Sequence, residues 1–203
     1  MFFYFSPRWG KVGEQEETMP YSIRDYQQKN IDDIRNELKN YKNILSVLPC
    51  GAGKAVIAAE IARLVTDRNN TVMFLVHRRE LCLQIKKTFE EHGVNMDLCK
   101  IGMVQTLTKR IKQMGKFGLI IVDEAHHTLA QSYINILNEQ QTYVVGFTAT
   151  PVRLKEGGLG RIYQSIVTGP TANWLIENNY LSPARCISIP VADMSGVKVT
   201  RGD

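Results

Sequence analysis

Two glycines and a lysine stand close together in the sequence LPCGAGK, and their types and spacing suit the binding of phosphate. Gly51 and Gly53 can turn backbone N–H groups inward, and the Lys54 ammonium can reach the outer phosphates of a nucleotide. A helix beginning near Lys54 would add the positive end of its dipole. An ordinary strand-to-helix turn accounts for one glycine but not for Gly-x-Gly-Lys, so the pattern predicts a phosphate-binding loop. Its predicted residues are Pro49, Cys50, Gly51, Ala52, Gly53, Lys54 and Ala55.

This loop departs from the stricter form of the pattern at two positions. Leu48 stands where glycine is usual, and Ala55 stands where Ser or Thr usually follows the lysine. That hydroxyl normally binds Mg²⁺, and Val56 offers no substitute for it. We therefore expect either that phosphates, water and an acid elsewhere hold the metal, or that hydrolysis is impaired.

Two adjacent carboxylates end the apolar run of IIVDEAHH, residues 120–127. Carboxylates at the end of a buried strand are costly unless they are used. Asp123 could hold Mg²⁺, and Glu124 could orient and deprotonate an attacking water. Capping of a following helix would explain one acid but not the whole string. On such a helix His126 and His127 would point apart, so we do not expect them to share a metal ion.

Apolar runs and helical periodicities alternate along the chain. The expected strands are residues 43–49, 71–76, 100–104, 117–123 and 142–148. The expected helices are residues 23–38, 55–65, 80–92, 105–114 and 125–137. This alternation indicates an α/β fold with a mostly parallel sheet and helices on both of its faces. Such sheets bind ligands beyond the carboxyl ends of their strands, which is where the candidate residues fall.

Cysteine spacing and apolar content limit the class of protein. The four cysteines form no Cys-x-x-Cys pair, which argues against a zinc site or a disulfide scaffold and fits a reducing compartment. They are Cys50, Cys82, Cys99 and Cys186. The start MFFYFSPRWG lacks the features of a signal peptide, and no run approaches the roughly 18 apolar residues of a membrane span. We expect a cytoplasmic protein.

Positive charge is concentrated in residues 77–116. This segment holds nine Lys and Arg residues against four acids, so it carries the whole net charge of +5. A local basic excess is a footprint for phosphate backbones, but a solvated helix face has the same composition. Charge alone leaves both interpretations open.

Six motifs in a fixed order carry a resemblance to a known family. They are IRDYQ (23–27), LPCGAGK (48–54), FLVHRREL (74–81), VQTL (104–107), DEAH (123–126) and GFTATP (146–151). From about Tyr21 onward, the chain resembles the first RecA-like domain of a superfamily-two DEAH-type helicase. It is similar above all to the group with restriction-enzyme helicase subunits and phage DNA-repair helicases, and residues 158–183 resemble the stretch that follows these motifs there. A phage-encoded chain of this kind would work in the host cytoplasm.

The resemblance implies an ATP site with Mg²⁺ as cofactor. In it, Arg24 and Gln27 belong to the adenine-recognition motif, and the Gln27 amide reads the edge of the base. The catalytic residues implied are Lys54, Asp123, Glu124 and His126, with Asp123 as the Mg²⁺ ligand.

The resemblance also implies nucleic acid as a partner, with DNA favoured over RNA. The basic segment lies where the family places its strand-gripping loops, which favours the nucleic-acid interpretation of the charge. The implied phosphate contacts are Arg78, Arg79, Gln105 and Thr106, which would position a strand without reading its sequence. Thr148 and Thr150 would couple hydrolysis to the grip on nucleic acid.

The expected organisation is a tail (1–18), a RecA-like domain (19–183) and a linker (184–203) toward a second RecA-like domain that this sequence lacks. Because that domain completes the ATP cleft in the family, we expect hydrolysis by the chain alone to be weak. One alternative is a catalytically impaired nucleic-acid-binding pseudoenzyme or regulator with the same fold. Another is a P-loop kinase or other small-molecule phosphotransferase, which the DEAH string and the TAT motif disfavour.

Overall fold

Strands and helices alternate in the computed structural model, which describes residues 22–151 and 158–183. The strands are β1 (Asn43–Val47), β2 (Val72–Val76), β3 (Cys99–Met103), β4 (Leu119–Val122), β5 (Tyr143–Thr148) and β6 (Ser165–Thr168). The α-helices are α1 (Asp25–Glu37), α2 (Lys54–Thr66), α3 (Arg79–Glu91), α4 (Val104–Arg110), α5 (Gln131–Gln140) and α6 (Ala172–Glu177). Three short 3-10 helices are η1 (Ile111–Gln113), η2 (Ala125–His127) and η3 (Leu159–Arg161).

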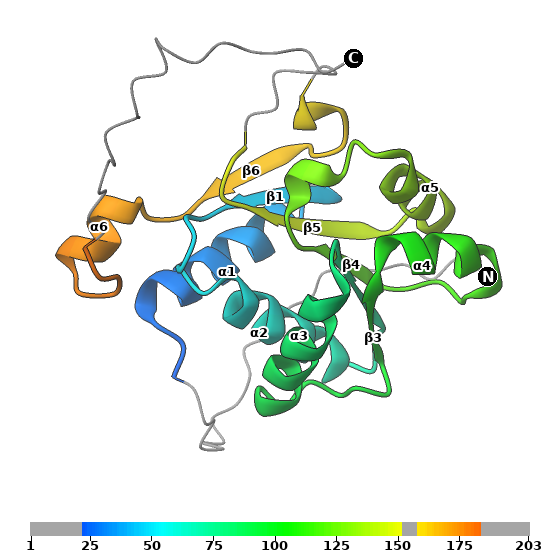
Figure 1. The fold of residues 1–203 in the computed structure, drawn as a ribbon, viewed down its shortest axis with the longest axis horizontal. Helices are drawn as coiled ribbons and strands as arrows, with labels where there is room; N and C mark the ends of the chain where they lie inside the picture. Colours follow the sequence, from blue (N-terminus) through cyan, green and yellow to red (C-terminus); the bar gives the residue numbers. More distant parts are fainter. Residues whose placement is uncertain (1–21, 152–157, 184–203) are drawn as a thin grey trace, which may run out of the picture.

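The strands form one sheet in the order β3-β2-β4-β5-β1-β6, and each neighbouring pair is parallel. Figure 1 shows β6 near one edge of this sheet and β3 near the other. Since all the strands point the same way, their carboxyl ends lie along one edge, where α/β sheets bind their ligands. The expected mostly parallel α/β fold is confirmed.

Side chains that alternate along the strands build two hydrophobic cores, one on each face of the sheet. In β4, Leu119 and Ile121 face the core shared with α1, α2 and α3, whereas Ile120 and Val122 face the core shared with α4 and α5. A parallel sheet covered by helices on both faces needs strands that are apolar throughout. This need explains why the strands are visible in the sequence as apolar runs.

The expected helix over residues 125–137 is wrong in its first half. Glu124 has a left-handed backbone with φ of 50°, and only the 3-10 turn η2 follows it before α5 begins at Gln131. Ala130, between η2 and α5, has an extended backbone with ψ of 142°, which interrupts any helix across residues 125–137. The expected divergence of His126 and His127 is also wrong, because their ring centroids lie only 4.2 Å apart.

Sequence pattern did not predict the last two elements, strand β6 and helix α6, within residues 158–183. Strand β6 pairs with β1, and α6 follows it with Thr171 as N-cap, whose hydroxyl accepts a hydrogen bond from the backbone N–H of Trp174. The predicted tail (1–18) and the predicted linker (184–203) lie outside the described residues. Within the described ranges, no helix has both the length and the apolar content needed to cross a membrane.

Candidate nucleotide and nucleic-acid site

The predicted phosphate loop links the end of β1 to the start of α2. Gly51 and Gly53 have φ of 80° and 78°, in the region where side chains other than glycine are strained. A methyl group at Gly51 would also lie 2.7 Å from Leu181, and one at Gly53 would collide with the Gln27 amide. Backbone conformation therefore favours glycine at both positions, and a side chain at either one would require Leu181 or Gln27 to move.

Helix α1 braces this loop through one carbonyl group. The Tyr26 hydroxyl and the Gln27 amide nitrogen both donate hydrogen bonds to the Ala52 carbonyl oxygen, at 3.0 and 3.2 Å. The Gln27 side-chain oxygen accepts a hydrogen bond from the Arg24 backbone N–H at 3.0 Å. Gln27 keeps one N–H and one lone pair for a further partner, so its use inside the protein does not exclude a contact with a base.

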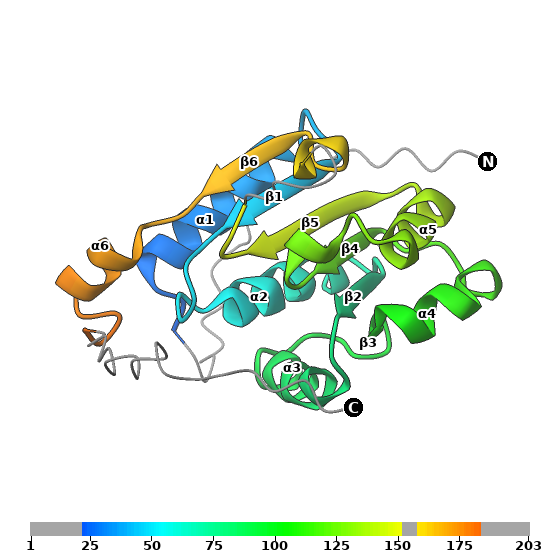
Figure 2. The same cartoon turned by 45° about the horizontal axis from the view of Figure 1, so that its top comes forward.

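Three aromatic side chains gather beside α1, and sequence reasoning did not identify them. Tyr26 lies edge-on to Trp174 and Tyr180, with ring centroids 6.1 and 5.0 Å away, and the Arg24 guanidinium lies 5.1 Å from the centre of the Tyr180 ring. Figure 2 shows α6 next to the start of α1, which is how residues so distant in the sequence meet. The position of Tyr26 inside the IRDYQ motif was the only local signal for this cluster.

Lys54 is the first residue of α2, and its ammonium donates hydrogen bonds to the carbonyl oxygens of Leu48 and Pro49, at 3.3 and 3.4 Å. These neutral acceptors leave its positive charge available for an anion. Ala55 is partly buried and packs against the hydrophobic core, and Cys50 is exposed with a free thiol. The loop thus has its lysine in place and no hydroxyl at position 55.

The two adjacent acids begin at the end of β4. The Asp123 N–H continues the ladder by donating to the Leu75 carbonyl, and its carboxylate accepts a hydrogen bond from the Glu124 N–H at 3.0 Å. Burial raises the pKa of Asp123 and the neighbouring Glu124 charge raises that pKa further, while the Glu124 N–H, Lys54 and His126 oppose the rise. A cation placed beside Asp123 would favour its charged form.

His126 joins these acids to the end of β5. Its Nδ1 atom lies 3.3 Å from a carboxylate oxygen of Glu124 and 3.2 Å from the Thr148 hydroxyl oxygen. The Thr148 hydroxyl donates its own hydrogen to the Thr150 carbonyl and accepts from the Thr150 N–H. Both contacts therefore require Nδ1 to carry the hydrogen, since neither oxygen has one to give. The structure thus joins two residues of the DEAH motif to Thr148 of the GFTATP motif.

A groove runs between α3, β3 and α4 and has a volume of about 1070 Å³. We call it the basic groove, because its charged lining consists of Arg79, Lys100 and Arg110 against Glu80 alone, with Thr106 and several apolar side chains beside them. Two of the predicted nucleic-acid contacts, Arg79 and Thr106, thus line the same groove, although 27 positions separate them in the sequence. The other two, Arg78 and Gln105, are exposed next to it in sequence.

Ion pairs divide the cations of residues 77–116 into two groups. Lys86 and Lys87 lie 3.6 and 3.7 Å from acids one turn later on α3, and Lys116 lies 3.8 Å from Glu139. The other six form no ion pair with any residue that the structure describes. These six are Arg78, Arg79, Lys100, Lys109, Arg110 and Lys112. Uncompensated cations of this kind attract phosphate backbones.

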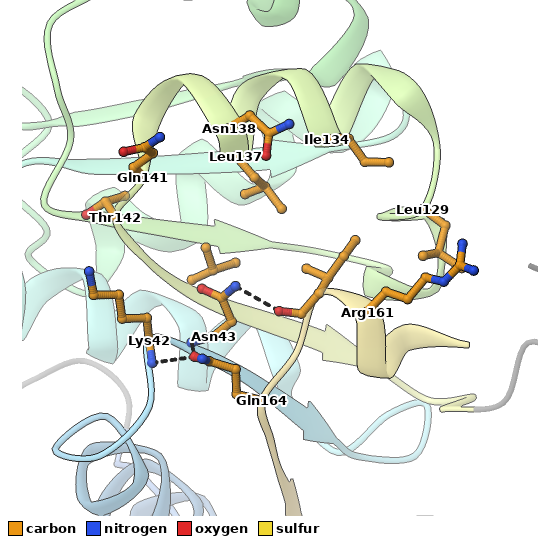
Figure 3. Close-up of a pocket in the computed structure, with 12 residues that line it drawn as sticks. Lys42, Asn43, Leu129, Ile134, Leu137, Asn138, Gln141, Thr142, Arg161 and Gln164 are labelled. Atoms are coloured by element: carbon orange, nitrogen blue, oxygen red, sulfur yellow. Dashed lines mark hydrogen bonds between the residues drawn. The ribbon is translucent and has the colours of Figure 1, made fainter. Parts of the chain in front are cut away.

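A second cavity, of about 690 Å³, lies beside α5 and the first residues of β1 and β5 and contains none of the predicted site residues (Figure 3). Its amides hold the chain together, because Gln164 accepts hydrogen bonds from the N–H groups of Lys42 and Asn43 at 2.8 and 3.1 Å. The Asn43 side chain donates to the Ile162 carbonyl at 2.7 Å. This cavity is where β6 is attached to β1, at the end of the sheet opposite the phosphate loop.

The residues present fit a nucleotide with Mg²⁺. Gly51 and Gly53 have the left-handed backbones that a glycine-rich phosphate loop uses, Lys54 places a cation at the loop, and Asp123 offers a carboxylate near that cation. Among the described residues, no group of three or more His, Cys, Asp and Glu side chains is arranged to hold a metal ion. A metal at this site would therefore take most of its ligands from phosphates and water, as Mg²⁺ commonly does.

A parallel sheet with a glycine-rich loop, an Asp-Glu pair and a threonine turn at its strand ends defines the class of RecA-like domains. More particularly, the chain belongs to the family described as type III restriction enzyme, res subunit, whose model matches residues 20–153. It is the first RecA-like domain of a superfamily-two helicase, as the resemblance predicted.

Individual relatives agree with this assignment. A 51.5 kDa protein of a Lactococcus phage is 38% identical over 156 residues, which cover 76% of this chain and 34% of the relative. A putative ATP-dependent helicase, IRC3 of Saccharomyces cerevisiae, is 32% identical, with 89% of this chain and 31% of the relative covered. The chain thus spans about a third of the length of these relatives.

The UvsW helicase of bacteriophage T4 has the same fold. Its crystal structure matches with a TM-score of 0.61 at 18% identity, over 73% of this chain and 60% of that one.

Proposed function

We propose that this chain is the ATP-binding domain of a nucleic-acid-dependent helicase or translocase, with DNA favoured over RNA. The observation that carries the proposal is the position of His126, which lies within hydrogen-bond reach of both Glu124 and Thr148. This contact joins the acids suited to hydrolysis to the turn that contains Thr150. DNA is favoured because the family is named for restriction enzymes, which act on DNA.

In the proposed reaction, Glu124 accepts a proton from a water molecule as the water oxygen attacks the γ-phosphorus of ATP. The bond from the γ-phosphorus to the bridging oxygen breaks, its electron pair stays with ADP, and inorganic phosphate leaves. Lys54 exchanges its two backbone carbonyl acceptors for the outer phosphates and stabilises their charge. Mg²⁺, held by Asp123, would supply further neutralisation of phosphate charge.

The basic groove and the loop at Arg78 would hold the sugar-phosphate backbone. Cations without ion pairs fit a contact that positions a strand and does not read its bases. A second RecA-like domain, the DEAH-type subgroup, a role in DNA repair and the domain limits at 19 and 183 belong to the same proposal. With one wall of the ATP cleft supplied by that second domain, turnover by the chain alone should be low.

The test is to measure ATP binding, oligonucleotide binding and ATP hydrolysis on the chain, and hydrolysis again when the chain is joined to a second RecA-like domain. We expect Mg²⁺-dependent ATP binding, DNA binding that weakens steeply with salt, and turnover that rises with DNA in the two-domain protein. Failure to bind any oligonucleotide at low salt would favour a small-molecule phosphotransferase. Binding of both ligands without turnover in either protein would favour the impaired nucleic-acid-binding alternative.

A further inference from the structure

Two histidines, His77 in the FLVHRREL motif and His127 directly after the DEAH motif, lie face to face. His77 directly follows β2, and His127 ends η2. Their rings are stacked with centroids 4.4 Å apart and planes inclined by 18°. The His127 ring also contacts the His126 ring, with centroids 4.2 Å apart. We call His77, His127 and His126 the histidine stack.

The pairing of strands β2 and β4 explains why His77 meets the histidines that follow β4. Strands β2 and β4 are parallel neighbours, with Leu75 opposite Val122, so the residues that follow both strands emerge side by side. His77 is followed at once by Arg78, the residue before α3, and His126 lies beside Glu124 and Thr148. The stack is therefore a continuous line of contacts from His77, the residue before Arg78, to His126 beside Glu124.

Packing of the rings holds His77 at this position. Its Nδ1 atom is buried and has no hydrogen-bond partner among the described residues. An imidazole that served only to satisfy polar groups would use that nitrogen, because a buried polar atom without a partner is costly. The interaction that holds His77 is therefore the stacking of its flat ring on His127. A displacement of His77 would displace the His127 ring as well.

We propose that His77 is a positioning residue that couples nucleic-acid contact at Arg78 and Arg79 to the placement of Glu124, through its stack on His127. The inference rests on the proposed function and deepens it. If the stack is the link, nucleic acid and nucleotide change each other's affinity by the same factor, and that factor depends on the flat ring at position 77. Each separate affinity depends on other residues and stays nearly constant.

The experiment measures the dissociation constant of a fluorescent single-stranded DNA with and without a non-hydrolysable ATP analogue and Mg²⁺. The ratio of the two constants is the coupling factor. Wild type should give a factor of about 5 or more, at the low end of typical couplings. His77→Ala should bring the factor close to 1, whereas His77→Phe, which keeps a flat ring, should retain it. Tyr41→Ala, which removes a partly exposed ring elsewhere, is the control and should match wild type.

Each outcome decides the matter. A His77→Ala protein that keeps the coupling factor overturns the proposal. The same holds if this variant loses affinity for DNA alone and for the ATP analogue alone while its coupling factor is unchanged. Should that variant fail to fold, His77→Leu replaces it, because leucine fills the space without a flat face, and coupling retained there is equally contrary. A wild-type factor of 1 with both ligands bound refutes the coupling alone, whereas absence of binding to either ligand refutes the proposed function itself.

Discussion

The predicted phosphate loop follows the carboxyl end of β1, the basic groove lies along α3, β3 and α4, and the two are built in opposite ways. The loop has two glycines in left-handed conformation, and two side chains of α1 fix one of its carbonyls. The groove displays the cations Arg79, Lys100 and Arg110 without ion pairs inside the described chain. A small ligand with a fixed shape binds more tightly to donors that are already held in position. A uniform polyanion such as a nucleic-acid backbone is bound by cations placed at suitable intervals. The two regions therefore predict different responses to substitution.

Removal of the Lys54 ammonium should have the largest effect. Lys54→Ala should lower ATP affinity by about tenfold or more, because hydrogen bonds to charged groups contribute roughly 1.5–3 kcal/mol. Isothermal titration of ATP with Mg²⁺ measures this loss. The matched control is Lys42→Ala at the cavity near β6, which should bind ATP like wild type. An unchanged affinity in Lys54→Ala would contradict the assignment of the loop.

The groove side should respond with a smaller and salt-dependent loss. Joint replacement of Arg78 and Arg79 by Gln should weaken oligonucleotide binding, and should flatten the plot of log affinity against log salt by about one unit for each phosphate that is no longer neutralised. Fluorescence anisotropy over a salt series measures both effects. Unrelated sequences should lose affinity equally, since backbone contacts carry no sequence information. A sequence-selective loss would contradict backbone binding.

The same helix offers a control for charge itself. Lys86 and Lys87 also lie on α3, but each has an acid near its ammonium group. Replacement of both by Gln removes the same formal charge as the arginine pair, and should leave the slope nearly unchanged. Equal losses of affinity in the two double variants would mean that overall positive charge attracts the nucleic acid. Arg78 and Arg79 would then have no special role in binding.

Position 55 tests whether the phosphate loop is complete. Ala55→Thr should raise turnover by about fivefold, equivalent to roughly 1 kcal/mol of barrier, with less than a twofold change in ATP affinity. Mg²⁺ keeps waters readily, so binding survives without the hydroxyl while alignment suffers. ATPase assays on a protein with a second RecA-like domain, carrying Ala or Thr at this position, provide the measurement. Equal turnover in the two proteins would show that the hydroxyl is dispensable.

The smallest effect expected is on base selection. In wild type, ATP should bind better than GTP, and Gln27→Ala should reduce that preference by about threefold, within the range of one net hydrogen bond. The quantity to measure is the ratio of the affinities for ATP and GTP. Loss of the Gln27–Ala52 hydrogen bond should weaken the binding of both nucleotides equally, so it leaves this ratio unchanged. A wild-type ratio near 1 would exclude Gln27 from adenine recognition.

Sequence patterns predicted the central part of the fold because one physical constraint dominates there. Strands covered on both faces are largely apolar, and two glycines mark the loop whose left-handed backbone disfavours other residues. Strand β6 escaped prediction because it is a four-residue edge strand whose Ile166 is 60% exposed. The helix expected from residue 125 failed because the extended backbone of Ala130 separates η2 from α5, although alanine itself favours helix.

The candidate site divides in the same way. Lys54, Asp123 and Glu124 were predictable because each lies in a short local pattern, whereas the contact of Tyr26 with Tyr180 and the histidine stack join residues that are distant in sequence. Such contacts depend on strand order, and no local spacing encodes strand order.

The order of strands also governs when this domain can take shape on the ribosome. Strand β1 has β5 and β6 as its neighbours, so its first partner is completed about 100 residues after β1 itself. At about 5–20 residues per second, the apolar segment Ile44 to Val47 would wait roughly 5–20 seconds for that partner. During synthesis, therefore, the phosphate loop is among the first functional segments made and among the last to be held in place.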